Sequence, residues 1–127
     1  MRAIVIGASA DRAKFGNRAV RAYVAAGWEI ACVNPTLPGG HIEGQPVFAT
    51  VEDVPRLDGG WDRALLYVPE RWGIGAVEKL SVRGDVKLVW FNPGADGAGV
   101  LAACTRLGVA HVRGCAILDV GPMPPGY

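Results

Sequence analysis

The sequence has little cysteine, almost no net charge and no long apolar run, and each shortage argues against a class of protein. Its three cysteines, Cys32, Cys104 and Cys115, are odd in number, widely spaced and set among apolar residues. That pattern indicates reduced thiols in a cytoplasmic protein and argues against a disulfide framework or a zinc site. The 13 Lys and Arg residues nearly balance the 12 Asp and Glu residues, for a net charge of +1. This balance gives no general attraction to nucleic acids or membrane surfaces, so neither is expected as a partner.

No apolar run approaches the roughly 18–20 residues that a membrane-spanning helix requires. The first residues, Met1-Arg2-Ala3, lead straight into a strand-like segment. They lack the apolar segment and small-residue cleavage site of a signal peptide. We therefore expect a cytoplasmic location.

Histidine is also scarce, with only His41 and His111 in the chain. Neither has a Cys or acidic partner at the spacing of a zinc site, and His111 lies in an apolar strand where a structural role is favoured. The sequence contains no Ser-His-Asp series and no evident pair of carboxylates for acid–base work. We expect a protein that has no metal and catalyses no reaction.

Glycine and proline, in contrast, are abundant, with 18 and 9 residues. They punctuate apolar segments and form no tract, which indicates many tight turns in an ordered chain. At 127 residues the chain is large enough for a single domain with a core of its own.

Apolar segments alternate with segments of helical periodicity along the whole sequence. The predicted strands are residues 3–6, 28–33, 63–68, 86–91 and 109–112, with residues 116–120 as an extension of the last one. The predicted helices span residues 15–26, 70–82 and a segment that ends at Gly108. In the first of them the apolar face comprises Phe15, Ala19, Ala22, Tyr23 and Ala26.

The segment between the second and third strands is predicted to be mostly loop. Residues 36–46 form that loop, Val47 and Phe48 a short extended piece, and Thr50 with Asp53 a capping box for one helical turn. Strands that alternate with helices through short connections predict a Rossmann-like, doubly wound parallel sheet of about five strands. The domain is expected to span residues 1–120, followed by an irregular tail over residues 121–127.

In a doubly wound sheet the ligand lies beyond the carboxyl ends of the strands. The segments at the exits of the predicted strands are Gly7-Ala8-Ser9, Val33-Asn34-Pro35, Val68-Pro69 and Phe91-Asn92-Pro93-Gly94. Small residues at the first of these turns let backbone N–H groups and a helix N-terminus approach a diphosphate. These four segments are the candidate site, and Trp72 is added because it follows the third strand closely.

The first turn departs from the dinucleotide fingerprint G-x-G-x-x-G. Its three positions are Gly7, Ser9 and Arg12, and the second strand ends in Asn34-Pro35 without the carboxylate that binds the adenosine ribose. Both departures argue against NAD. Arg12, Lys14 and Arg18 place positive charge near the start of the first helix, which would suit phosphate groups but is equally typical of a solvated helix face.

The chain as a whole resembles a known family, and six segments carry the resemblance. They are Gly7-Ala8-Ser9, Val33-Asn34-Pro35, residues 44–55, Tyr67-Val68-Pro69, Trp90-Phe91-Asn92-Pro93-Gly94 and Gly114-Cys115-Ala116-Ile117. In this order they resemble the small bacterial and archaeal CoA-binding proteins and the amino-terminal domain of the α subunit of succinyl-CoA synthetase. The resemblance runs from about Arg2 to Ile117 and implies a Rossmann-like domain that binds coenzyme A.

The resemblance also assigns roles to particular residues. Ser9, Ala10, Asp11 and Arg12 match the turn that touches the CoA diphosphate, and Phe91-Asn92-Pro93 matches the segment against the thiol-bearing arm. Leu37 stands where the synthetase has a phosphate-binding lysine, so that contact is missing here. The predicted cofactor-binding residues are Gly7, Ala8, Ser9, Ala10, Asp11, Arg12, Lys14, Asn34, Pro35, Val68, Pro69, Trp72, Phe91, Asn92, Pro93 and Gly94.

The leading hypothesis is a noncatalytic protein that binds coenzyme A or an acyl-CoA. One alternative is a small NAD(P)- or flavin-dependent oxidoreductase. Another is an interaction module whose nucleotide site is vestigial. The sequence leaves the biological role and any protein partner open.

Overall fold

The computed structural model describes all residues, 1–127, as one α/β domain built on a single sheet. Its strands are β1 (Arg2–Ile6), β2 (Glu29–Val33), β3 (His41–Ile42), β4 (Gln45–Phe48), β5 (Arg63–Leu66), β6 (Val89–Phe91) and β7 (His111–Arg113). Its helices are α1 (Phe15–Ala25), the short 3₁₀ helix η1 (Val51–Asp53), α2 (Glu70–Arg83), α3 (Ala98–Leu107) and α4 (Ala116–Val120). No helix has the length and apolar character needed to cross a membrane.

The strands are ordered β3-β4-β2-β1-β5-β6-β7, and every neighbouring pair is parallel except β3 with β4. The chain moves outward from β1 through β2 to β4 and then returns to place β5 on the other side of β1. The strand order therefore reverses between β1 and β5, which is where doubly wound sheets bind their ligands. Ile6 at the end of β1 is paired with Val33 on one side and Leu66 on the other.

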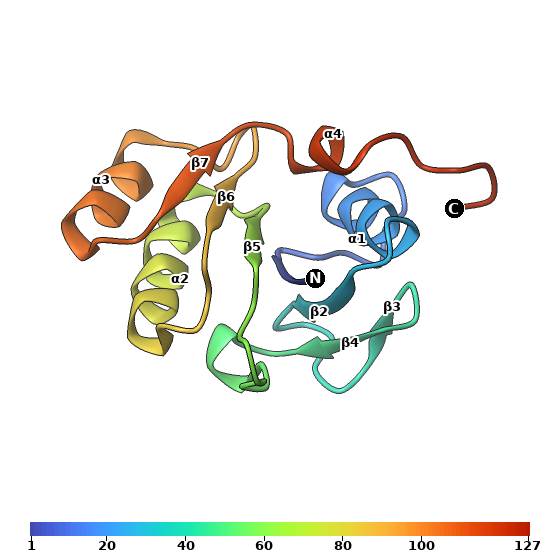
Figure 1. Cartoon of the computed structure of the whole chain (residues 1–127), viewed down its shortest axis with the longest axis horizontal. Coiled ribbons are helices and arrows are strands. Elements are labelled where there is room, and N and C mark those ends of the chain that lie inside the picture. The colour runs from blue at the N-terminus through green and yellow to red at the C-terminus, as the bar shows by residue number, and fades with distance from the viewer.

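Helices cover both faces of the sheet, with α1 and α4 on one face and α2 and α3 on the other (Figure 1). Alternate residues of β1 point to opposite faces. Ala3 and Val5 pack in the cluster that contains Tyr23 of α1, whereas Ile4 and Ile6 pack in the cluster that contains Val77 of α2. Because both faces of the strand are buried, it reads as an uninterrupted apolar run in the sequence.

The expected fold is confirmed, but the sheet has seven strands where the sequence predicted about five. The addition is the antiparallel hairpin of β3 and β4, which lies where a loop was predicted up to Pro46. Its two-residue turn is Glu43-Gly44, and both residues have positive φ, 48° and 78°. A hairpin turn of this kind is ordinarily signalled by Asn-Gly or Asp-Gly, so Glu-Gly gave no signal in the sequence.

The prediction of a strand extension over residues 116–120 was wrong, because this segment forms α4. Two side chains distant in sequence fix its start at Ala116: Asn92 Oδ1 accepts a hydrogen bond from the Ala116 N–H at 2.9 Å, and the Tyr23 hydroxyl donates to the Ala116 carbonyl at 3.0 Å. The last strand also begins two residues later than expected, at His111.

The predicted apolar face of the first helix was wrong at both ends. Phe15 is 62% exposed and Ala26 lies beyond the helix in solvent. Near its start α1 instead buries Gly16 and Asn17, which lie against the turn after β1. The helix therefore sits close to that turn.

Candidate functional site

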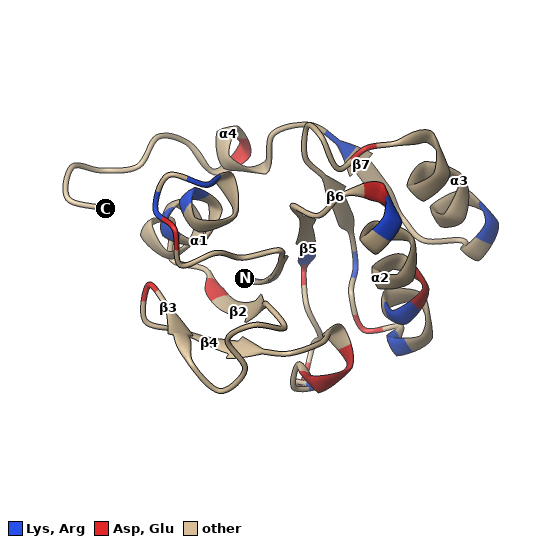
Figure 2. Cartoon of the chain, turned by 180° about the vertical axis from the view of Figure 1, so that it is seen from behind, with Lys and Arg blue, Asp and Glu red and all other residues tan.

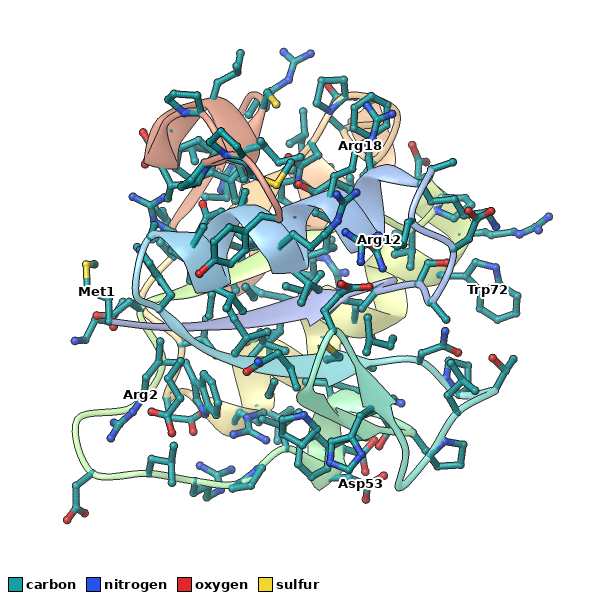
Figure 3. All side chains as sticks on the ribbon, turned by 90° about the vertical axis from the view of Figure 1, so that its right-hand side faces the viewer. Met1, Arg2, Arg12, Arg18, Asp53 and Trp72 are labelled. Carbon is teal, nitrogen blue, oxygen red and sulfur yellow. The ribbon has the colours of Figure 1, made fainter.

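A cleft of about 610 Å³ opens at the carboxyl edge of the sheet, next to the point where the strand order reverses. Its walls come from the turn after β1, the end of β2, the segment between β4 and η1, the end of β5 and one face of α2. Figure 3 shows Trp72 at this edge of the molecule, on the side opposite Met1 and Arg2. The lining residues are Ile6, Gly7, Ala8, Ser9, Lys14, Val33, Asn34, Pro35, Ala49, Thr50, Val51, Tyr67, Val68, Arg71, Trp72, Gly75, Ala76 and Lys79.

Gly7 shapes the turn at the bottom of the cleft. Its φ of +89° is a conformation that other residues rarely adopt, and its N–H donates to the Val33 carbonyl at 3.1 Å. A β carbon there would lie 2.9 Å from both the Tyr67 carbonyl oxygen and Val68 Cγ1. Glycine is therefore required by the backbone conformation and by the close approach of the segment after β5.

The turn after Gly7 has backbone donors without partners, and two of them belong to the cleft-lining residues Ala8 and Ser9. The N–H groups of Ala8, Ser9 and Ala10 make no hydrogen bond within the chain. Helix α1 follows at Phe15 with neither a capping side chain nor an acidic residue in its first turn. Free N–H groups and an uncapped helix N-terminus together favour an anion such as a phosphate.

A polar network around the buried Asn17 holds this turn in place. Asn17 is fully buried, and its amide donates to the Ser9 carbonyl at 2.9 Å and to Glu43 Oε2 at 3.1 Å. Glu43, at the tip of the β3–β4 hairpin, also forms an ion pair of 2.9 Å with Arg12. Arg21 completes the network through hydrogen bonds to Asn17 Oδ1 and to the Arg12 carbonyl. The hairpin thus fixes the shape of the turn.

Asn34 directly follows β2, where a dinucleotide-binding domain has its ribose-binding carboxylate. Its amide nitrogen donates to the Ala8 carbonyl at 2.9 Å. Its Oδ1 accepts from both the N–H and the hydroxyl of Thr36, at 2.8 and 2.7 Å. Because these bonds tie two loops together, the side chain acts as a structural link between them.

The charge of the cleft is positive. Lys14, Arg71 and Lys79 are among the lining residues, and none of the lining residues is Asp or Glu. Lys79 forms an exposed ion pair of 3.2 Å with Glu52 of η1, and the Arg71 guanidinium lies 5.6 Å from the centre of the Trp72 ring. Figure 2 shows basic residues on both α1 and α2. The donor set therefore suits an anionic ligand with several phosphate groups.

Apart from Trp72, the α2 wall was not predicted from the sequence. Arg71, Gly75 and Lys79 are spaced by four residues and so share one helix face, which here turns toward the cleft. A β carbon at Gly75 would meet no atom within 4 Å, so this glycine leaves open space along the wall. The four-residue spacing of two basic residues around a glycine was the available signal. Ala49, Thr50 and Val51 on the opposite wall had no such signal.

The structure brings together about half of the predicted binding residues. Those that line the cleft are Gly7, Ala8, Ser9, Lys14, Asn34, Pro35, Val68 and Trp72. Those that do not line it are Ala10, Asp11, Arg12, Pro69, Phe91, Asn92, Pro93 and Gly94.

Residues of the second group have structural contacts of their own. Asp11 accepts a hydrogen bond from the Ala13 N–H at 3.0 Å, and Arg12 is engaged with Glu43. Phe91 is fully buried in the core. Asn92, only 2% exposed, donates to the Leu66 carbonyl at 3.1 Å and accepts from the Ala116 N–H, so it ties β5 to α4.

Comparison with solved structures shows the same fold in other proteins. A conserved hypothetical protein from Pyrococcus furiosus is 27% identical, with a TM-score of 0.79 over 93% of this chain and 97% of that chain. A protein from Thermus thermophilus is 19% identical, with a TM-score of 0.82 over 93% of this chain and 86% of that chain. No functionally curated protein matches the chain.

A larger protein contains a similar domain. The dinucleotide forming acetyl-coenzyme A synthetase 1 of Ca. Korarchaeum cryptofilum, in complex with phosphate and ADP, is 22% identical, with a TM-score of 0.72. The match covers 87% of this chain but 25% of the synthetase. A family model described as a CoA binding domain matches residues 2–120, nearly the whole sequence. The chain therefore belongs to the CoA binding domain family.

Proposed function

We propose that this protein binds coenzyme A or an acyl-CoA in the cleft and catalyses no reaction on it. The observation that carries the proposal is the combination of free backbone N–H groups at the Gly7 turn with a cleft that contains three cations and no carboxylate. The diphosphate would lie against the turn, where the N-terminus of α1 adds its favourable dipole.

The residues of the cleft fit coenzyme A better than NAD. Coenzyme A carries a diphosphate and a separate 3′-phosphate, and the three cations Lys14, Arg71 and Lys79 match that charge. The amide of Asn34 is committed to the Ala8 carbonyl and to Thr36, where a nicotinamide cofactor needs a carboxylate for its ribose.

The chemistry of the lining residues supports binding without catalysis. The cleft presents hydroxyl groups, amines and a guanidinium, but no histidine, cysteine or carboxylate among its lining residues. General acid–base catalysis uses histidine most often and carboxylates next, and a serine or threonine nucleophile needs such a base within hydrogen-bond reach. The wall residues therefore suit a role in holding a ligand.

Thermal unfolding with four ligands tests the proposal. A ligand that binds only the folded state adds about 2.7 kcal/mol of stability at a hundred times its Kd. Coenzyme A should therefore raise the Tm by roughly 5–10 °C, and NAD, NADP and FAD should raise it less at equal concentration. A shift with NAD or FAD alone would favour the oxidoreductase alternative. No shift with any of the four at millimolar concentration would favour the vestigial module.

A pair of variants tests whether coenzyme A raises the Tm by binding in the cleft. In Ser9→Tyr a large ring fills the space at the turn, so the shift with coenzyme A should disappear. Thr105→Tyr places the same ring on the exposed face of α3, outside the cleft, and should leave the shift unchanged. An equal loss of the shift in both variants would contradict binding at the turn.

A further inference from the structure

We infer that Lys79 is the residue that recognises the phosphate monoester of the bound nucleotide, and that it exchanges its partner Glu52 for that phosphate. The inference rests on the proposed function and assigns the ligand specificity of the same cleft. It predicts that coenzyme A binds more tightly than 3′-dephospho-CoA because of this one side chain.

The first step of the argument is the position of the three cations. Lys14 immediately precedes α1, and Arg71 is in the first turn of α2, so both stand at the carboxyl edge beside the free N–H groups of the turn. Lys79 is eight residues further along α2, which corresponds to about 12 Å along the helix axis. Two cations thus adjoin the diphosphate position, and the third is set apart for a second anionic group.

The second step is the weakness of the contact that Lys79 makes now. Its ion pair with Glu52 joins α2 to η1 at 3.2 Å, and the side chains of Lys79 and Glu52 are 44% and 65% exposed. An exposed pair of this kind contributes little and is easily broken. A phosphate dianion offers more negative charge and more acceptor oxygens than one carboxylate, so it can displace Glu52 from the ammonium group.

The third step is the lack of any other available cation beyond Lys79. A neighbouring cavity of about 310 Å³ shares Lys79 with the cleft and continues along the same helix. It is lined by the carboxylates of Glu52 and Glu78 and by Arg56 and Arg83. Arg83 donates to the carbonyls of Val51 and Val54 and to Asp85, and Arg56 donates to the Arg83 carbonyl. Lys79, whose partner is one exposed carboxylate, is therefore the cation of this region that is most easily given to a phosphate.

Titration calorimetry with coenzyme A and 3′-dephospho-CoA tests the inference. The wild-type protein should bind coenzyme A about tenfold or more tightly than 3′-dephospho-CoA. In Lys79→Met this preference should fall to within about twofold, with the affinity for 3′-dephospho-CoA unchanged. Lys14→Met should weaken both ligands equally. Glu52→Gln should strengthen binding of coenzyme A alone, because it removes the competitor for Lys79.

A matched control and a pH series sharpen the test. Lys87→Met removes a lysine that also forms an exposed ion pair, with Asp62, but at the opposite edge of the sheet. It should leave the preference intact. Since the second pKa of a phosphate monoester is about 6, the preference should grow between pH 5 and 7 in the wild type and stay flat in Lys79→Met.

The outcomes separate this inference from the proposed function. If coenzyme A binds and Lys79→Met retains the preference or the pH dependence, the role of Lys79 is overturned while the proposed function stands. NAD and NADP, which differ by a phosphate monoester, serve as the second pair of probes. If coenzyme A fails to bind but NADP is preferred over NAD through Lys79, the proposed function is wrong and the inference holds. If neither pair binds, both are overturned.

Discussion

Gly7 and Tyr67 approach so closely that a β carbon on Gly7 would lie 2.9 Å from the Tyr67 carbonyl oxygen. This contact joins the segments that leave β1 and β5, the two strands between which the strand order reverses. The other glycine of interest, Gly75 on α2, lies in open space, where a β carbon would meet nothing within 4 Å. The structure therefore requires glycine at position 7 but has room for a side chain at position 75.

The first prediction compares alanine at these two positions. Gly7→Ala should lower the free energy of unfolding by at least about 2 kcal/mol, because it combines a positive φ with a contact against backbone. Gly75→Ala should raise it by up to about 1 kcal/mol, because alanine favours the helix more than glycine does. Urea unfolding measures the free energy of unfolding of both variants. A Gly75→Ala variant less stable than the wild type would show that position 75 has no room for a β carbon.

The second prediction uses Gly75 to fill the cleft. Gly75→Leu should abolish the Tm shift with coenzyme A while the protein without ligand melts no lower than the parent, because the side chain enters space reserved for ligand. Thr105→Leu, on the exposed face of α3, is the control and should keep the shift. Retention of the full shift in Gly75→Leu would mean that the ligand does not lie along α2.

Arg83 and Asp85 fasten the far end of α2 to η1. Arg83 is buried, with 7% of its surface exposed. Its guanidinium donates to the carbonyls of Val51 and Val54 at 2.8 and 2.6 Å. It also donates two hydrogen bonds of 2.9 Å to the Asp85 carboxylate. Burial alone would raise the pKa of Asp85, but the bonds from Arg83 outweigh it, and the pKa is lowered from its usual value.

The third prediction follows from the sign of that shift. A carboxyl whose pKa is lower in the folded state stabilises the protein above its ordinary pKa of about 3.9, and this contribution is lost as the pH falls through the folded value. Stability should therefore decline below about pH 4, and Asp85→Asn should decline less steeply over that range. Asp58→Asn, at an exposed carboxylate, is the control. Parallel pH profiles for Asp85→Asn and the wild type would rule out this role for the pair.

The fourth prediction concerns the thiols. Burial raises the pKa of Cys32 to about 12 and also raises the pKa of Cys104, so neither forms much thiolate near neutral pH. Cys115 is only partly buried. Iodoacetamide at pH 8 should add one label to the folded protein, and none to Cys115→Ser, as measured by intact mass. A second label without denaturant would show that one of the buried thiols is accessible.

The sequence predicted those elements whose formation is local. The uninterrupted apolar run Ala3–Ile6 indicates a strand that is buried on both faces, and the glycine after it marks the turn. The helix at Ala116 could not be predicted in the same way, because it begins where Asn92 and Tyr23 hold the chain, and both are distant in sequence.

The same distinction between local and long-range contacts applies to the candidate site. The strand exits, including Gly7 and Asn34, were predictable because the carboxyl ends of parallel strands meet at one edge. Arg71 and Lys79 were missed because helical periodicity gives the faces of α2 but not the one that turns toward the cleft. Phe91 ends β6 and Asn92 follows it, yet the Phe91 side chain is buried in the core and the Asn92 side chain is bonded to β5 and α4.

The sheet ends in very short strands on both sides, the two residues of β3 and the three of β7. An unpaired outer strand is a template on which another chain can add a strand of its own, and the gain grows with each further backbone hydrogen bond. Edge strands as short as β3 and β7 offer few backbone hydrogen bonds to another chain. The protein is thereby protected against edge-to-edge aggregation even though the interior of its sheet is among the most apolar parts of the chain.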